Sequence, residues 1–355
     1  MQREAKAGKK SNVESKGFWH QSGLELLDGE YHIVHGGILT RSDYSLLFEG
    51  EGGKRHLPIE ATGQINVYAD VEVSASALRL MSKRGVKVAY FDGAGRLQGV
   101  YRPAEDMVSG DLVLEQCSVY SDAPARLAYA KEFERAGFVN MRANLCYYAK
   151  RGNQTLKWAA GELSRMADRL DGCKDIGSVM LLEARARSTY YSAFDAIVAG
   201  SGFCFGRRTK RPPENEMNAM VSFGNAMLYN KLLQIIQKTR LDARIGIVHA
   251  TNNRPASLHL DFADIFKPLV VDRAIFALVN RHEIKRHEHF KREGVAVLLN
   301  DEGRRILVEK IEDKFGTEIT VAGDKMTYEQ LMQYEVDRYQ NTLEEGELYQ
   351  PLKLR

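Results

Sequence analysis

The spacing of apolar residues changes once along this chain, near residue 120, and this change limits the folds open to it. Between Tyr31 and about Glu115 the apolar residues form short runs, such as VKVAYF (86–91) before the turn-forming residues DGAG (92–95). Such runs are typical of β-strands and hairpins. After about Ser121, long stretches carry apolar residues at the spacing of amphipathic helices. We therefore expect an α+β chain in which a small, mostly β domain precedes a larger all-α catalytic domain.

This division gives three segments. Residues 1–30 are polar and lysine-rich, and we interpret them as a tail or linker. Residues 31–120 form the expected β-rich domain and residues 121–355 the helical domain, a size that allows both to bury a core. The expected strands cover 31–38, 44–49, 56–59, 64–68, 86–91 and 97–101, with one helix over 74–84. The expected helices of the second domain cover 123–150, 155–170, 176–198, 216–239, 257–280, 303–314 and 328–343.

Composition excludes several classes of protein. The net charge of +3 is too small to indicate nucleic-acid binding, so evidence for such binding must come from local clusters of basic residues. The four cysteines (Cys117, Cys146, Cys173 and Cys204) are scattered without CxxC spacing, which argues against a zinc ribbon or a disulfide framework. A reducing cytoplasm fits this pattern best. The sequence shows no signal peptide and no apolar run of membrane-spanning length.

Residues 245–273 hold the densest set of candidate ligands. His249 lies in a loop-like stretch, and Asp261 and Asp264 follow on an expected helix, where positions three apart share a face. Ser257 is a candidate N-cap, and Pro268 should kink or end the helix. Imidazole and carboxylate groups suit a divalent metal. From these residues alone, a solvated helix face with a chance histidine nearby is about equally consistent.

A further acid is expected from residues 176–198. An apolar stripe through Ile176, Met180 and Tyr190 places Glu183 on the face that should be buried, whereas Asp195 lies off it. A buried carboxylate is unfavourable unless it is paired or binds a metal. The alternative is a helix edge at which Glu183 pairs with an arginine.

A basic segment, FGRRTKRPP (205–213), lies between these two regions. It could hold phosphates, although a charge run of this kind is more often a solvated loop. In the helix that follows, Gly224 indicates close helix packing, and Asn218 is either a polar core residue or a site residue.

Four segments in order resemble the CRISPR adaptation integrase family, the first of the Cas proteins. They are EARARSTYY, RRTKRPP, NAMVSFGNAMLYN and GIVHATNNRPASLHLDFADIFKPLVVDR. The strand VKVAYFD before them is similar to part of that family's N-terminal domain, so the resemblance extends from about Tyr31 to the C-terminus. Asp264 and Lys267 stand where the family often has Glu and Arg.

The resemblance implies that Glu183, His249 and Asp264 are catalytic metal ligands, with Asp261 as a supporting acid. It implies a Mg²⁺- or Mn²⁺-dependent DNA endonuclease and integrase that inserts new spacers into a CRISPR array by 3′-hydroxyl attack on a phosphodiester. The implied partners are protospacer and repeat DNA, a second copy of the chain, and the small second Cas protein. Some members carry an upstream nuclease domain, so a fused or separate nuclease is a further implied partner. The candidate DNA contacts are Arg185, Arg187, Arg207, Arg208, Lys210 and Arg211.

Two other functions remain open at this stage. A stand-alone, structure-specific nuclease acting on branched DNA would use the same site residues. A non-catalytic DNA scaffold with a vestigial site is disfavoured by the intact set of acid, histidine and acid. The histidine-rich segment RHEIKRHEHF (281–290) lacks metal-ligand spacing, and we expect it to be structural or solvated.

Overall fold

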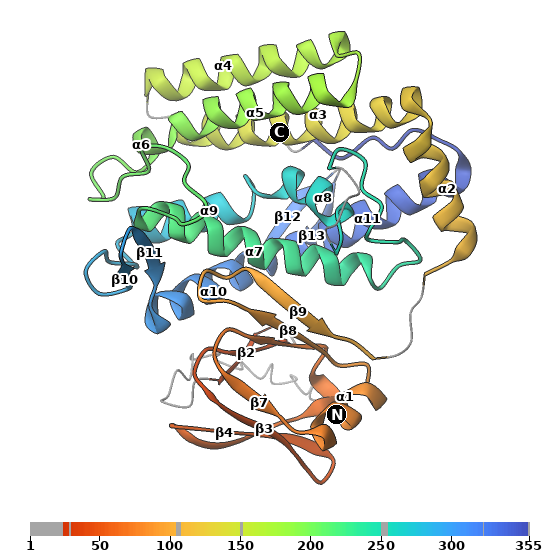
Figure 1. Ribbon diagram of the computed structural model, residues 1–355. Helices are drawn as coiled ribbons and strands as arrows, with labels where there is room; N and C mark the ends of the chain where they lie inside the picture. Colours follow the sequence, from red (N-terminus) through yellow and green to blue (C-terminus); the bar gives the residue numbers. More distant parts are fainter. Residues whose placement is uncertain are drawn as a thin grey trace, which may run out of the picture.

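The computed structural model describes residues 24–27, 30–103, 108–149, 152–249, 255–321 and 323–353. Two β-sheets lie together at one end of the molecule, and the helices of the later part of the chain fill the other (Figure 1). This arrangement confirms the expected α+β fold class. In the described part of the chain, no helix has the length and apolar character needed to span a lipid bilayer.

The two sheets are built from the strands between residues 24 and 101. One sheet has the order β1-β2-β6-β8-β9, and the other has the order β5-β4-β3-β7. Strand β2 runs parallel to β6, and β6 runs parallel to β8. The strands are β1 (Leu24–Leu27), β2 (Glu30–Ile33), β3 (Gly37–Ser42), β4 (Ser45–Gly50), β5 (Gly53–Leu57), β6 (Gln64–Val67), β7 (Val71–Val73), β8 (Lys87–Phe91) and β9 (Leu97–Tyr101).

The strands differ from the sequence expectation in several places. Strand β7 was not expected, and the run expected over 56–59 divides between β5 and the 3₁₀ turn at Ile59–Ala61. The run 31–38, expected as one strand, splits into β2 and β3, which belong to different sheets. The expected polar tail (1–30) lies mostly outside the described residues, yet within it Leu24–Leu27 forms β1, which pairs antiparallel with β2. A periodicity of two cannot show that a run divides between sheets, because both halves keep the same alternation.

The glycine-rich segment 92–95 forms the expected hairpin turn between β8 and β9. Asp92 organises it, because its Oδ1 accepts hydrogen bonds from the backbone nitrogens of Ala94 (3.0 Å) and Arg96 (2.9 Å). Gly95 has a φ of +74°, and a Cβ there would lie 2.4 Å from the ring of Phe223. The turn therefore requires glycine, both for its backbone conformation and for contact with a helix of the other half.

The helices follow the expected ranges closely, with two exceptions. Helix α2 was not expected, and the expected helix over 176–198 divides into α5 and α6. The break around Pro268 in the expected helix 257–280 confirms the prediction that this proline kinks or ends it. The helices are α1 (Ala75–Lys83), α2 (Gly110–Ser121), α3 (Ala123–Ala149), α4 (Gln154–Arg169), α5 (Ile176–Ser192), α6 (Phe194–Ile197), α7 (Glu216–Ile236), α8 (Leu258–Phe266), α9 (Val271–Asn280), α10 (Asp301–Phe315) and α11 (Tyr328–Glu345), with 3₁₀ turns at Ile59–Ala61 and Leu170–Gly172. Two short hairpins, β10 (Phe290–Glu293) with β11 (Ala296–Leu299) and β12 (Glu318–Val321) with β13 (Asp324–Thr327), interrupt the region expected to be all-α.

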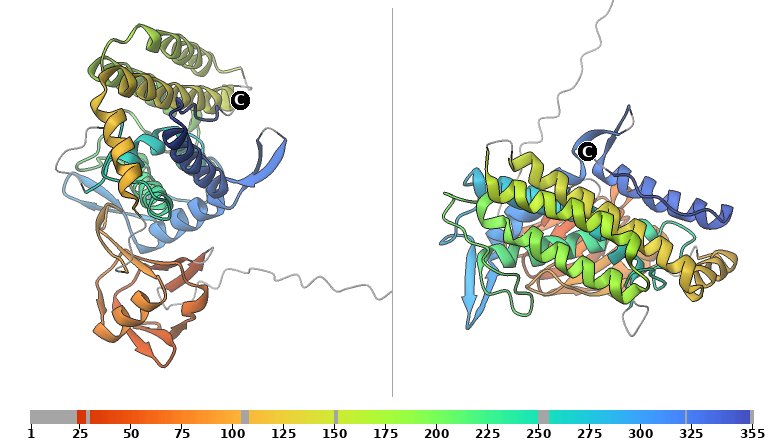
Figure 2. Two further views of the ribbon diagram at one scale, coloured as in Figure 1. Left: turned by 90° about the vertical axis from the view of Figure 1, so that its right-hand side faces the viewer. Right: turned by 90° about the horizontal axis from the view of Figure 1, so that it is seen from above.

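Helix α7 runs through the centre of the helical part. Helices α3, α4 and α5 pack together on the side away from the sheets, and α8, α9, α10 and α11 pack around α7 (Figures 1 and 2). A Cβ at Gly224 of α7 would lie 2.7 Å from Cγ1 of Val271 on α9. The close helix packing expected at Gly224 is therefore confirmed.

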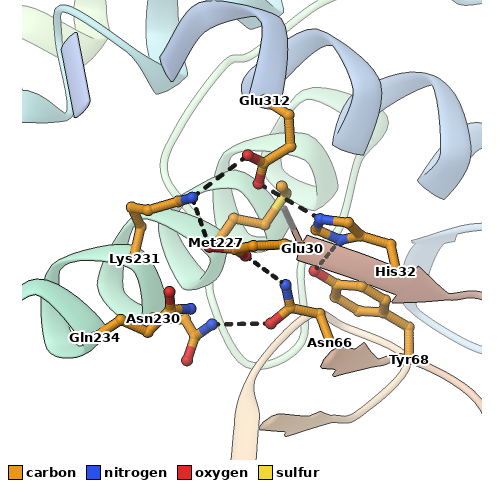
Figure 3. A pocket seen from close by; sticks show the side chains of 9 residues that line it. All are labelled: Glu30, His32, Asn66, Tyr68, Met227, Asn230, Lys231, Gln234 and Glu312. Atoms are coloured by element: carbon orange, nitrogen blue, oxygen red, sulfur yellow. Dashed lines mark hydrogen bonds and ion pairs between the residues drawn. The ribbon is translucent and has the colours of Figure 1, made fainter. Parts of the chain in front are cut away.

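A buried polar cluster joins the sheets to the helices (Figure 3). Lys231 of α7 places its Nζ 2.7 Å from Oε1 of Glu30 on β2 and 3.6 Å from Oε2 of Glu312 on α10. His32 of β2 lies 3.7 Å from Glu312 and 3.2 Å from the hydroxyl of Tyr68. These side chains are almost fully buried. Their charges therefore interact with one another rather than with water, and they link the sheets to the helical part.

Candidate active site

Three acidic side chains from different helices converge in the helical part. They are Glu134 of α3, Glu183 of α5 and Asp264 of α8. Among the described residues, the ligand atoms that come within 4.8 Å of one another here belong to these three, and His249 is not a member of the group. The structure thus brings two of the expected ligands together and adds a carboxylate that the sequence interpretation missed.

Arg187 lies between two of these acids. One turn after Glu183 on α5, its guanidinium pairs with Glu183 and places Nη2 2.5 Å from Oδ1 of Asp264. The alternative that Glu183 pairs with an arginine therefore describes the contact observed. This contact does not exclude a metal role for Glu183. Arg187 also pairs with Asp264 on another helix, whereas a simple pair at a helix edge would involve Glu183 alone. Tyr190 of the expected stripe is buried, but its earlier part runs through Val179, Leu182 and Ala186 instead, and Glu183 borders it.

Asp264 is almost fully buried, with a 2% exposed side chain. Lys267 places its Nζ 2.7 Å from Oδ1, while Oδ2 is buried without a hydrogen-bond partner. Burial acts to raise the pKa of Asp264, but the positive charges of Arg187 and Lys267 outweigh it and hold the pKa well below its usual range. Asp264 is therefore an ionised carboxylate with one oxygen available to a further cation.

Asp261 has a different set of contacts, although it lies three residues before Asp264. Its carboxylate accepts hydrogen bonds from the backbone nitrogens of Ile247 (2.5 Å), Val248 (3.3 Å) and His249 (3.0 Å). Its Oδ1 also lies 2.8 Å from Nδ1 of the His249 ring. The loop that carries His249 is thus wrapped around Asp261. Ser257 occupies the N-cap position of α8 as expected, but its hydroxyl does not bond the first turn of the helix and instead bonds the backbone of Arg244 and Gly246 in that loop.

His249 lies at the border of the site, with a side chain that is 25% exposed. Burial acts to lower the pKa of His249, but the hydrogen bond to Asp261 and the charge of Asp264 raise it above its ordinary value. The imidazole therefore responds to the charge of the acid cluster, although its ring nitrogens are not grouped with the three carboxylates.

Glu134 was missed by the sequence interpretation, which treated residues 123–150 as core helix only. Its side chain is almost fully buried, and neither of its carboxylate oxygens has a hydrogen-bond partner. Burial, together with the charges of Asp264 and Glu183, raises the pKa of Glu134 well above its usual range. The signal was present in the sequence, since Glu134 shares the apolar face of α3 with Ala130, Phe133 and Met141.

The basic segment before α7 borders the same site. Burial and then the charge of Arg208 lower the pKa of Lys210, with smaller contributions from Lys267 and Arg187. Lys210 therefore lies within electrostatic range of Glu183 and of the cations beside it. The other candidates Arg185, Arg207 and Arg211 are exposed, and Arg207 lies 3.4 Å from Glu214. Arg187, expected to contact DNA, lies instead within the acid cluster.

Asn218 is the residue that fixes the shape of this segment. Its side-chain oxygen accepts hydrogen bonds from Nη1 of Arg208 and from the backbone nitrogen of Thr209, both at 3.0 Å. Its side-chain nitrogen donates to the carbonyl of Arg207 at 2.8 Å. Asn218 is itself fully buried, so it is both a polar core residue and a support for the site.

The histidine-rich segment 281–290 has a structural role, as expected. His289 is buried, and its Nδ1 accepts a hydrogen bond from the backbone nitrogen of Lys285 at 2.9 Å. His282 and His287 are exposed.

The donor set of the acid cluster fits a divalent metal ion. Both oxygens of Glu134 and Oδ2 of Asp264 are buried without partners, and buried carboxylate oxygens otherwise find a hydrogen bond or a cation. Carboxylate oxygens, with an imidazole nearby, are the ligands typical of Mg²⁺ and Mn²⁺ sites. The site can therefore hold a metal cofactor.

Comparison with known proteins identifies the family. The sequence profile of the family described as CRISPR associated protein Cas1 matches residues 31–313, which is most of the chain. The chain belongs to the Cas1 family. The resemblance inferred from the four sequence segments is therefore confirmed.

Relatives of this Cas1 chain match it over nearly their whole length. It is 34% identical to the CRISPR-associated endonuclease Cas1 2 of Thermodesulfovibrio yellowstonii over 322 residues, which is 90% of this chain and 97% of that relative. It is 33% identical to the CRISPR-associated endonuclease Cas1 of Pyrococcus horikoshii, again over 90% of this chain and 97% of the relative.

Solved structures extend the comparison to the Cas1 fold. A Cas1 protein from Thermotoga maritima matches with a TM-score of 0.81 and 32% identity, covering 92% of this chain and all of that one. A casposase bound to its integration product matches with a TM-score of 0.80 and 19% identity, covering 90% of this chain and 92% of that one. At that identity the second match shows a shared fold.

Proposed function

We propose that this Cas1 chain is a metal-dependent DNA endonuclease and integrase that inserts new spacers into a CRISPR array. The observation that carries the proposal is the convergence of Glu183 and Asp264, with His249 within electrostatic range of Asp264, in a chain whose relatives are named endonucleases. The casposase of the same fold was solved with an integration product, which supports strand joining as the reaction.

We assign the metal to Glu183, Asp264 and His249, and the ion to Mg²⁺ or Mn²⁺. When bound, the ion would neutralise non-bridging phosphate oxygens and activate the attacking hydroxyl. Asp261 orients His249: because an ionised carboxylate only accepts hydrogen bonds, Nδ1 of the ring is the donor to Asp261 and Nε2 keeps its lone pair.

The basic residues then hold the DNA backbone. Lys210 and Arg208 border the acid cluster, and Arg185, Arg207 and Arg211 offer exposed charges further out. Such contacts position a phosphate without reading its sequence. In strand joining, a DNA 3′-hydroxyl attacks phosphorus, one P–O bond forms and one breaks, so the number of phosphodiester bonds is unchanged. With water as the nucleophile, the same site would cut DNA.

The proposed assembly is a homodimer joined to Cas2. Its support is the family itself, together with a solved Cas6-RT-Cas1–Cas2 complex of the same fold, with a TM-score of 0.78 and 19% identity. Light scattering of the purified chain, alone and with Cas2, measures both associations. A nuclease acting upstream in adaptation is a further proposed partner.

A plasmid integration assay tests the proposed function. A labelled duplex with free 3′-hydroxyls is incubated with the purified chain, Cas2, Mn²⁺ and a supercoiled plasmid that carries a CRISPR repeat. We expect metal-dependent joining that is lost in His249→Asn and retained in His287→Asn, a matched change at an exposed histidine. Nicking without joining would instead favour the stand-alone nuclease.

A further inference from the structure

Glu134 is an acidic side chain in this site with no assigned role. It lies on α3, in a part of the chain remote in sequence from Glu183 and Asp264, and its side chain is 1% exposed. A carboxylate so deeply buried is expected to have hydrogen bonds or a counter-ion. Neither of its oxygens has a hydrogen-bond partner.

The nearby cations do not satisfy Glu134. Arg187 forms its ion pairs with Glu183 and Asp264, and Lys267 pairs with Asp264. Glu134 is thus left facing two other carboxylates, with ligand oxygens from all three within 4.8 Å of one another. With Arg187 and Lys267 already paired, ionisation of Glu134 beside the other two carboxylates requires a further cation. Glu134 and Asp264, which carry these unpartnered oxygens, belong to the same group of three acids.

We propose that Glu134 is a further ligand of the divalent metal, so that the ion is held by carboxylates from three helices, α3, α5 and α8. This inference rests on the proposed function for the metal itself and adds a residue to it. Mg²⁺ and Mn²⁺ take oxygen ligands readily and accept more of them than Glu183, His249 and Asp264 supply. A third carboxylate also ties the metal to α3, so metal binding should stabilise the packing of α3 against α5 and α8.

The test measures metal affinity in the absence of DNA. Mn²⁺ binding to the purified full chain is followed by titration calorimetry and by loss of the free Mn²⁺ signal in electron paramagnetic resonance. We expect Glu134→Gln, which keeps the side-chain shape, to weaken Mn²⁺ binding by roughly tenfold or more. Glu132→Gln is the matched control, because Glu132 lies on the same helix but pairs with Arg135 and Lys353 nearer the surface.

Thermal unfolding separates this result from a folding defect. Without metal, Glu134→Gln should melt at or above the temperature of the wild-type chain, because it removes an unpaired buried acid. Added Mn²⁺ should raise the melting temperature of the wild-type chain and of Glu132→Gln, but raise that of Glu134→Gln much less.

The possible results separate a failure of the ligand role of Glu134 from a failure of the proposed function. Wild-type Mn²⁺ affinity in Glu134→Gln, beside lost affinity in Glu183→Gln, would overturn the role of Glu134 and leave the proposed function standing. No Mn²⁺ binding by the wild-type chain would overturn both. Weakened binding in Glu134→Gln with an unchanged metal-free melting temperature would support the inference.

Discussion

Asp261 holds His249 through a single carboxylate oxygen, which lies 3.0 Å from the backbone nitrogen of His249 and 2.8 Å from its ring Nδ1. Asp264, one turn later on the same helix, instead pairs with Arg187 and Lys267. These two acids on one helix therefore make different contacts. Asp261 shapes the loop that carries the histidine, while Asp264 pairs with two cationic side chains.

The first prediction concerns Asp261→Asn. An asparagine can still accept hydrogen bonds from the backbone nitrogens, but it can present an NH₂ group to Nδ1 and so favour the wrong tautomer of His249. We expect the rate of DNA joining to fall by roughly 10- to 100-fold, the loss typical of residues that support a metal ligand.

The joining rate and the melting temperature are measured together for this variant. Asp168→Asn, a change at an exposed acid of α4, should leave both unchanged. A wild-type joining rate in Asp261→Asn would show that the tautomer of His249 is not set by this contact.

The second prediction concerns the polar cluster between the two halves. Lys231 is 2% exposed and is the cation shared by Glu30 and Glu312. Lys231→Met would leave buried carboxylates without their cation, and we expect the free energy of unfolding to fall by about 3–5 kcal/mol.

Urea unfolding measures this change. Lys238→Met, at an exposed lysine just after α7, should alter the free energy of unfolding by no more than about 0.5 kcal/mol. A loss below about 1 kcal/mol in Lys231→Met would mean that water or other groups satisfy Glu30 and Glu312.

The third prediction concerns the pH dependence of stability. Burial lowers the pKa of His32 to about 4, although the charge of Glu30 opposes it. Below pH 6.5, the ordinary pKa of histidine, His32 is protonated in the unfolded chain but stays neutral in the folded chain. The free energy of unfolding therefore falls as the pH falls from about 6.5 toward 4. Glu30 acts in the same direction, since burial raises its pKa but Lys231 more than offsets this and lowers it overall.

His32→Gln should remove the histidine part of this slope. Between pH 7 and pH 5 the wild-type chain should lose about 2 kcal/mol more of its free energy of unfolding than the variant. His35→Gln, at a half-exposed histidine of the same segment, should keep the wild-type slope. Equal slopes in the wild-type chain and His32→Gln would show that folding does not lower the pKa of His32.

The fourth prediction concerns DNA binding by the basic segment. Replacing Arg207 and Arg208 together with glutamine should weaken DNA binding and lower its dependence on salt, because each lost phosphate contact removes roughly 1 from the slope of log K against log salt. Fluorescence anisotropy at several salt concentrations measures this slope. Lys54→Gln, in the β-sheet region, is the control and should keep the wild-type slope. The same slope in the double variant would place the DNA elsewhere.

The parts of the site that lie on one element were predictable from the sequence. Glu183 and Asp264 were expected because their positions fall within motifs of single helices. Glu134 was not expected, because its link to them exists only once α3 packs against α5 and α8. Likewise, a three-residue spacing places Asp261 and Asp264 on one face but cannot show that a loop folds around the first of them.

In the fold, too, local features were predictable and contacts between distant segments were not. Long helices and the β8–β9 hairpin were predicted, since periodicity and turn residues specify them locally. The splitting of residues 31–38 between two sheets, and the contact of Lys231 with Glu30, depend on pairing between distant segments. Such pairing leaves no local pattern to detect.

The most direct test of the central claim, that Glu183, His249 and Asp264 act as one metal-dependent centre on DNA, is a comparison of single and combined variants. The rate of Mn²⁺-dependent joining is measured for Glu183→Gln, for Asp264→Asn and for the double variant. Residues that act as a unit give losses that do not add, so each single change should abolish joining and the double change should cost no more. Near-wild-type joining in either single variant, or losses that multiply in the double variant, would contradict a shared centre.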